Sequence, residues 1–219
     1  IGLIITSHAV HPSVRKVLPY DLLKDFVAVT NVVEAPNLLV VNPKLPVKTV
    51  QDLIALGKQR SLNFAAPGLG GPGHLGGVMF TSMAGLNTQL MRGDADFMFT
   101  TMLSGLPQAE SGQVRAIAIT SGKRSPLKPD LPTVAESGLK GFELVTWYGI
   151  IAKAGTPKVI VDRLAQDIQA VALEPKLAAH LAADGTQVVA TSADQFGPYL
   201  TSEVRKWSEV IKQANIKPE

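Results

Sequence analysis

The stretch LNFAAPGLGGPGHLGG, residues 62–77, decides the fold of this chain. An apolar run over residues 62–66 leads into a cluster of glycines and two prolines, and apolar residues at helical spacing follow, namely Leu75, Val78, Met79 and Met83. The stretch therefore predicts a strand, a glycine-rich turn and a helix. Glycines let a ligand approach the backbone, and free N–H groups at a helix N-terminus bind anions, so the turn also predicts a site for a small anion.

The same glycines also fit a different kind of site, one that binds a dinucleotide. Gly68, Gly70 and Gly73 match the G-x-G-x-x-G pattern of dinucleotide-dependent enzymes, and Asp94 follows at about the spacing of an acid that binds the ribose. Three features weaken this alternative. Pro72 lacks an N–H for the pyrophosphate, the turn lies in the middle of the chain, and Asp94 precedes a predicted strand instead of ending one. A plain structural turn is the third interpretation.

Strands alternate with helices along the chain, which predicts an α/β fold. Most predicted strands are continuous apolar runs, which favour mainly parallel sheets covered on both faces. We expect helices to begin at Thr49, at Thr156-Pro157, at Pro175, and at Ser192 with Gln195 as its capping-box partner. The predicted strands are residues 2–6, 28–33, 38–41, 62–66, 95–99, 114–120, 142–151 and 187–190.

Composition narrows the class of protein. The chain has 219 residues, 46% of them hydrophobic and 18% charged, which is typical of a globular protein. The net charge of +3 comes from scattered cations, and 5% aromatic residues are few for base stacking, so nucleic-acid binding is not expected. Cysteine is absent from the sequence, which excludes disulfides, thiolate metal sites and cysteine nucleophiles.

No catalytic set can be assembled from the sequence. The four histidines are His8, His11, His74 and His180, and only the first two are close, without a carboxylate beside them. His74, in the first turn of the predicted helix, is interpreted as a packing or capping residue. The sequence thus predicts no enzyme, no cofactor and no metal.

Five segments together resemble one family. They are LPYDLLKDF (18–26), NFAAPGLGGPGHL (63–75), ITSGKRSPLKPDLPTVAESGLKGFE (119–143), WYGIIAKAGTP (147–157) and KWSEVIKQANIKPE (206–219). In this order they resemble the extracytoplasmic solute receptors of the tripartite tricarboxylate transporter family, often called Bug receptors. The resemblance runs along the whole chain.

The resemblance implies a type II periplasmic-binding-protein-like fold, with two α/β lobes joined by hinge strands that close on a ligand. Lobe one would take residues 1–33 and 147–219, and lobe two residues 34–146. The implied function is a periplasmic, monomeric receptor that captures a small organic carboxylate and delivers it to the membrane transporter subunits of the same system. A role in sensing through a partner kinase is left open.

The resemblance also implies ligand-binding residues. The second ligand loop of the family corresponds to the glycine turn, with the backbone facing a carboxylate. Two positions depart from the family, which often has Ser where this chain has Ala66 and Gly71, and an Asp-Asn pair is replaced by two threonines after the strand at 95–99. The implied ligand-binding residues are Thr6, Ser7, Ala66, Pro67, Gly68, Gly70, Thr100 and Thr101.

Two segments of the family pattern have no counterpart in the printed sequence. Family members carry a signal peptide, a first strand and a first ligand loop before the equivalent of Ile1. They also carry a Val-Pro-Tyr-Lys-Gly segment at the position of the Leu90–Met91 junction. We therefore expect the encoded protein to contain further residues at both places.

Overall fold

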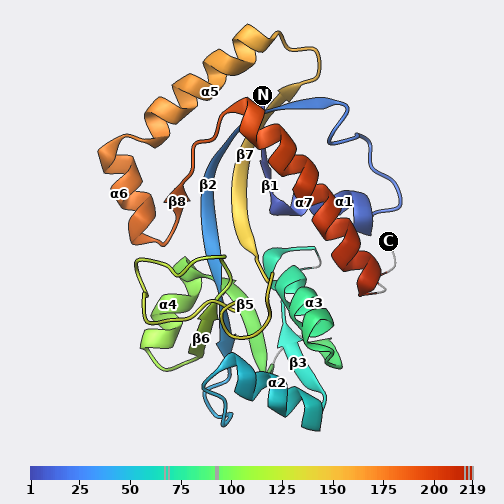
Figure 1. Cartoon of the computed structure of the whole chain (residues 1–219), viewed down its shortest axis with the longest axis vertical. Helices are drawn as coiled ribbons and strands as arrows, with labels where there is room; N and C mark the ends of the chain where they lie inside the picture. Colours follow the sequence, from blue (N-terminus) through green and yellow to red (C-terminus); the bar gives the residue numbers. More distant parts are fainter. Residues whose placement is uncertain (67, 69, 92–93, 215, 217, 219) are drawn as a thin grey trace. The chain divides into compact units, whose positions relative to one another are not determined.

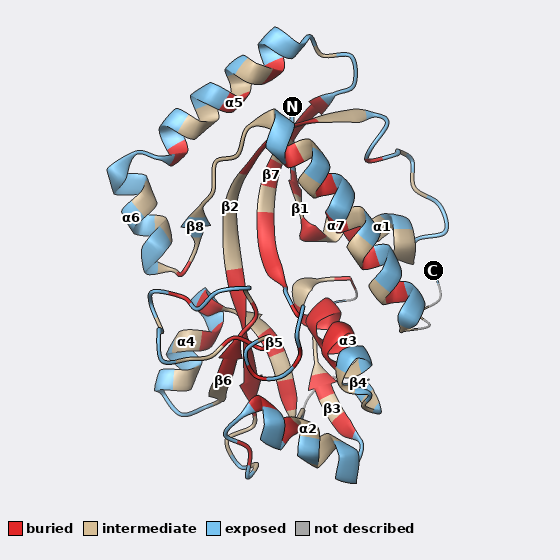
Figure 2. Cartoon of the chain, viewed as in Figure 1, coloured by how far each residue is buried: buried red, intermediate tan, exposed pale blue. Residues whose placement is uncertain are grey.

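The computed structural model describes residues 1–66, 68, 70–91, 94–214, 216 and 218. The chain divides into two compact units, a first unit of Ile1–Ala35 with Thr146–Glu219 and a second unit of Pro36–Val145. Among the described residues, no helix combines the length and the apolar composition that crossing a membrane requires. The elements, labelled in Figure 1 except for β4, which Figure 2 labels, are β1 (Gly2–Ile5), α1 (Thr6–Val14), β2 (Phe26–Val41), α2 (Val50–Gln59), β3 (Leu62–Ala65), α3 (Pro72–Ala84), β4 (Thr88–Met91), β5 (Phe97–Thr101), α4 (Met102–Glu110), β6 (Arg115–Ile119), β7 (Val145–Lys153), α5 (Lys158–Ala172), α6 (Pro175–Ala183), β8 (Gln187–Val188) and α7 (Ala193–Gln213).

The first unit is built on strands β1, β7, β2 and β8, in that order. Helix α1 packs on α7, and α5 contacts both α6 and α7. Figure 2 shows buried residues along one side of α7 and through β7. Trp147 from β7 meets the ring of Phe196 from α7 edge to face, at 5.8 Å between centroids, and both side chains are fully buried. This aromatic pair lies in the core of the unit.

The second unit is built on strands β6, β2, β5, β3 and β4. Helix α3 covers β3 and β5, and helix α4 covers β5 and β6. The side chains of β5 alternate, so Phe97 and Phe99 are buried on one face while Met98 packs on the other, against the cluster around Met102. Buried rings form the core under α3, namely Phe64, Phe80, Phe97, Phe99 and Phe142.

The strand directions correct one prediction. Mainly parallel sheets were expected, but β2 pairs antiparallel with β5, β6 and β8, and β1 pairs antiparallel with β7. Only the pairings of β3 with β4 and with β5 are parallel among those described. The apolar run at 38–41 is buried throughout, as expected, but an antiparallel strand covered on both faces is buried in the same way.

Several predicted boundaries are confirmed and others are wrong. Thr49 and Ser192 are capping-box N-caps of α2 and α7, and Pro175 opens α6. Pro157 is itself the N-cap of α5, one residue later than predicted. Among the strands, the predicted segments 28–33 and 38–41 form one strand, β2, while β5 starts at Phe97 and includes Thr100 and Thr101, and β7 starts at Val145. Among the helices, α4 was not predicted, and Thr6, predicted to end a strand, begins α1. Met83, predicted on the apolar side of α3, is exposed.

The connection between β4 and β5 is unusually short. Both strands run parallel to β3 and flank it, yet only residues 92–96 join them. A crossover between parallel strands ordinarily needs a dozen residues or more. The absence of a family segment at Leu90–Met91 stays a prediction, and the gene sequence would decide it.

Two glycines let α3 lie very close to the sheet. A Cβ atom added at Gly76 would lie 2.5 Å from the Phe99 ring, and one added at Gly77 would collide with the Phe64 ring. Residues Gly73–Phe80 of α3 are buried throughout. The second half of the glycine-rich stretch is therefore explained by packing, because only a residue without a side chain allows this approach.

We expect Gly77→Ala to lower the free energy of unfolding by about 1–3 kcal/mol, because the added methyl group overpacks the Phe64 side of the core. Gly68→Ala is the matched control, since a Cβ there meets nothing within 4 Å and its φ is not in the left-handed region. Urea unfolding followed by circular dichroism measures both. Equal midpoints for the two variants would contradict the packing role of Gly77.

Candidate functional site

Two helices of the second unit begin at the same edge of its sheet. Strands β3 and β5 are parallel neighbours, so their carboxyl ends, Ala65 and Thr101, point the same way. Helix α3 follows β3 through the glycine turn, and α4 follows β5 directly. In open α/β sheets, ligands bind outside the carboxyl ends of the strands. This edge is the candidate site in the second unit.

The two central glycines of the turn differ in burial, since Gly68 is exposed and Gly70 is buried. A Cβ at Gly68 or Gly70 would meet nothing within 4 Å, and Gly70 has a φ of +73°, which favours glycine. Ala66 is half-buried at the end of β3, and Pro67 lies outside the described residues. Gly71 is the N-cap of α3, and Pro72 at the first helical position has no N–H to offer.

One backbone amide of the turn is already occupied by a side chain. The N–H of Gly70 donates to Nδ1 of His74 over 3.2 Å. His74 is only 7% exposed and stacks on Phe64, with 6.3 Å between the ring centroids. Burial lowers the pKa of His74, which keeps the ring neutral and able to accept this hydrogen bond. Of the two predicted roles, packing is confirmed by this burial, while the hydrogen bond goes to Gly70 and not to the N-cap Gly71.

The contact between His74 and Gly70 was not predicted from the sequence. A signal existed, because a polar side chain at the third helical position commonly accepts an N–H from the residues just before the helix. The same device recurs in the first unit, where Nδ1 of His8 accepts the N–H of Ile5 over 3.1 Å at the start of α1.

The two threonines at the end of β5 have different surroundings. Thr101 is the N-cap of α4, and its Oγ1 accepts the N–H of Ser104 over 3.3 Å. The Cγ2 methyl of Thr100 lies close to Gly105 of α4, because a Cβ at Gly105 would be 2.7 Å from it. Thr101 thus shares the edge with the glycine turn, while Thr100 packs toward α4.

Thr6 and Ser7 belong to the first unit, in the first turn of α1. Thr6 is fully buried, and its Oγ1 accepts the N–H of Trp147 over 3.0 Å. Ser7 is half-buried. The Thr6 hydroxyl therefore joins α1 to β7 within the core, and a ligand role for either residue stays a prediction.

The Trp147 side chain continues this chain of contacts. Its Nε1 donates to Oε2 of Glu203 over 2.9 Å, and Nε1 of Trp207 donates to the same oxygen over 3.1 Å. Lys206 forms an ion pair with the other carboxylate oxygen and lies over the Trp207 ring. The buried carboxylate is thus paired and hydrogen-bonded, as burial of a charge requires.

Asp96 has a structural role. Asp96 forms a two-pronged ion pair with Arg60, at 2.7 and 2.9 Å, and accepts the N–H of Asn63, and the Arg60 guanidinium is the main reason why its pKa is lowered. Asp94, the acid of the dinucleotide alternative, is exposed. Across the part of the chain that the structure describes, no group of three His, Cys, Asp or Glu side chains could hold a metal ion.

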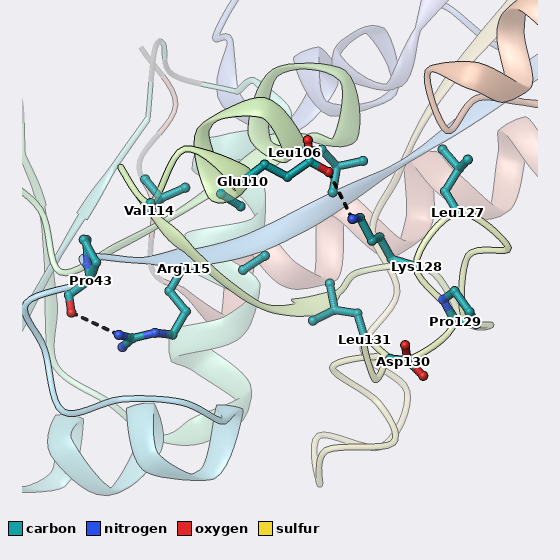
Figure 3. Close-up of a pocket in the computed structure, with 13 residues that line it drawn as sticks. Pro43, Leu106, Glu110, Val114, Arg115, Leu127, Lys128, Pro129, Asp130 and Leu131 are labelled. Atoms are coloured by element: carbon teal, nitrogen blue, oxygen red, sulfur yellow. Dashed lines mark hydrogen bonds and ion pairs between the residues drawn. The ribbon is translucent and has the colours of Figure 1, made fainter.

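A groove of about 790 Å³ lies elsewhere on the second unit, beside α4 (Figure 3). Leu106, Val114 and Leu131 line it with apolar groups, and the Lys128–Glu110 ion pair, at 3.1 Å, links its two walls. Arg115 turns to one end, where it donates to the carbonyls of Pro43, Leu45 and Val47. Its cation therefore holds the 43–47 turn, and the groove presents no set of polar groups converging on a ligand.

We expect Thr6→Val to lower the free energy of unfolding by about 1–3 kcal/mol, because it leaves the buried N–H of Trp147 without its acceptor. Thr6→Ser keeps the hydroxyl and should retain most of the stability. Thermal and urea unfolding of the two variants measure the difference. If Val and Ser at this position give the same stability, the hydrogen bond is not what Thr6 contributes.

Comparison with known proteins assigns the chain to a family. A family model described as Tripartite tricarboxylate transporter family receptor matches residues 1–216. The chain is 29% identical over 215 residues to the UPF0065 protein in the tcbD-tcbE intergenic region of Pseudomonas sp. strain P51, which covers 91% of this chain and 64% of that protein. The chain thus spans less than two thirds of that relative's length.

Solved structures agree with this match. The structure of R. palustris Rpa4515 with adipate has a TM-score of 0.85 at 28% identity, over 99% of this chain and 78% of that one. The periplasmic binding protein BugD has a TM-score of 0.84 at 29% identity, with the same coverage. The predicted periplasmic-binding-protein-like α/β fold is confirmed. The chain belongs to the tripartite tricarboxylate transporter family of receptors.

Proposed function

We propose that this chain is a periplasmic solute receptor that binds a small organic carboxylate and delivers it to a membrane transporter of the same system. The glycine turn is the observation that carries the proposal. It combines the exposed Gly68 and the left-handed turn at Gly70, which is itself buried, with the N-terminus of α3 at the carboxyl edge of the sheet. Such an arrangement favours an anion, since helix N-termini offer N–H donors and a positive dipole.

The matched family and the ligand of one solved relative support a carboxylate as the bound solute. The family is one of receptors, and the R. palustris relative at 28% identity was solved with adipate, a dicarboxylate. The first and second units would supply the two lobes of such a receptor.

The test is a thermal-shift screen of mono-, di- and tricarboxylates, aromatic ones included, on the full-length protein. A bound ligand raises the melting temperature by mass action, so adipate or a related acid should stabilise the protein at concentrations well above Kd. No stabilisation by any carboxylate would overturn the proposal. Saturable binding of NADH in a parallel titration would favour the dinucleotide alternative instead.

Gly68→Val tests the turn itself. We expect it to fold, because a Cβ at this position meets nothing within 4 Å, yet to weaken carboxylate binding at least about tenfold, since losing one charge-assisted hydrogen bond costs about 1.5–3 kcal/mol. Asp94→Asn, an exposed position, is the matched control and should keep wild-type affinity. Calorimetric titration with the best acid of the screen compares them. Normal binding by folded Gly68→Val would remove the turn from the site.

A further inference from the structure

The carboxylate site of the glycine turn has one ionisable side chain among its described residues 66, 68 and 70–74, and this side chain is His74. Its Nδ1 accepts the N–H of Gly70 over 3.2 Å, and both residues are buried. An amide nitrogen can only donate, so Nδ1 carries no proton here and the neutral ring has its proton on Nε2. The amide that a carboxylate would need is therefore held by an acceptor within the protein.

A carboxylate that takes the Gly70 amide would displace Nδ1 and leave its lone pair facing a negative charge. We propose, building on the proposed function, that His74 is the cation of this site: the Gly70 N–H passes from Nδ1 to the ligand carboxylate, and Nδ1 takes one proton from solvent and donates it to the same carboxylate. No covalent bond to carbon changes, and one proton is gained per ligand bound. The carboxylate would then accept hydrogen bonds from two donors, the Gly70 N–H and the protonated Nδ1 of His74, and its charge strengthens both bonds.

The surroundings of His74 suit this exchange. Burial is the one cause of its lowered pKa, so no charged side chain of α3, of β3 or of the described turn residues shifts it. Its stacking partner from β3 is Phe64, which carries no charge. Without a counter-ion, the ring stays neutral in the free chain near neutral pH, and a bound carboxylate would raise its pKa.

The sign of the pH dependence follows. Between the lower pKa of the free chain and the higher pKa of the complex, binding takes up a proton, so affinity rises as pH falls. Above the pKa of the complex, and below that of the free chain, affinity is flat. The rise is at most about tenfold per pH unit for one proton.

His8 and His11 are the other histidines that could produce such a dependence. They lie on α1, with 5.4 Å between their rings, near the predicted ligand residues of the first unit. The pKa of His11 is lowered by burial, by His8 and by Arg15. His180, on α6, is exposed. Each histidine therefore has to be replaced separately.

The experiment is calorimetric titration of the full-length protein with adipate between pH 8 and pH 6.5, where both carboxyl groups of adipate stay ionised. Two buffers of different ionisation enthalpy count the protons taken up. We expect uptake approaching one proton and an affinity that rises about three- to tenfold per pH unit over part of this range. His74→Asn keeps an oxygen acceptor for Gly70 but cannot titrate, so its affinity should be flat. His180→Asn should behave as wild type.

The outcomes separate the two proposals. No binding of adipate or of any screened carboxylate at any pH overturns the proposed function and this inference with it. Binding that is flat with pH in the wild type, or a dependence that survives in His74→Asn and disappears in His8→Asn or His11→Asn, overturns this inference alone. Should His74→Asn fail to fold, NMR titration of the His74 ring in the wild type decides, because an equal pKa with and without adipate also overturns the inference.

Discussion

The close approach of α3 to the sheet of the second unit is the constraint on which the rest of that unit depends. Gly76 and Gly77 present no side chain to Phe99 and Phe64, so the helix axis can lie where a Cβ would otherwise collide. The aromatic core then fills the space beside the helix. Because the helix is rigid, this contact also fixes where α3 begins, and so where the first-turn amides are presented.

The glycine-rich stretch thus serves two different physical needs. Gly68 and Gly70 lie in the turn, where the backbone conformation matters, while Gly76 and Gly77 lie in the buried helix, where the volume of a side chain matters. The G-x-G-x-x-G match spans both regions, because its third glycine, Gly73, is already buried in α3. This explains why the dinucleotide pattern can appear in a chain of a receptor family.

Local signals in the sequence predicted local structure well. The capping boxes at Thr49 and Ser192 depend on a side chain and an amide three residues apart, so nothing distant can hide them. The antiparallel pairing of β2 depends on partners far along the chain and could not be read from its apolar run. Helix α4 was missed because Gly105 and Pro107 interrupt its pattern, whereas in the structure Gly105 makes room for Thr100 and Leu38.

The candidate site was predictable in outline and not in detail. Glycines after an apolar run predicted a turn at a helix N-terminus. That His74 would hold the Gly70 amide depends on the left-handed conformation of Gly70, which turns its N–H back toward the first turn of α3. The burial of Thr6 against Trp147 likewise depends on the pairing of β1 with β7, which brings residues more than 140 positions apart into contact.

The shared carboxylate of Glu203 has a consequence for optical spectroscopy. The sequence contains two tryptophans, Trp147 and Trp207, and both are buried in the first unit with their indole N–H groups on one oxygen. Indole emission is sensitive to a nearby charge and to solvent, so the intrinsic fluorescence of the protein reports on this unit and is silent about residues 36–145. An emission-detected unfolding curve would therefore coincide with a backbone-detected one only if the two units unfold together.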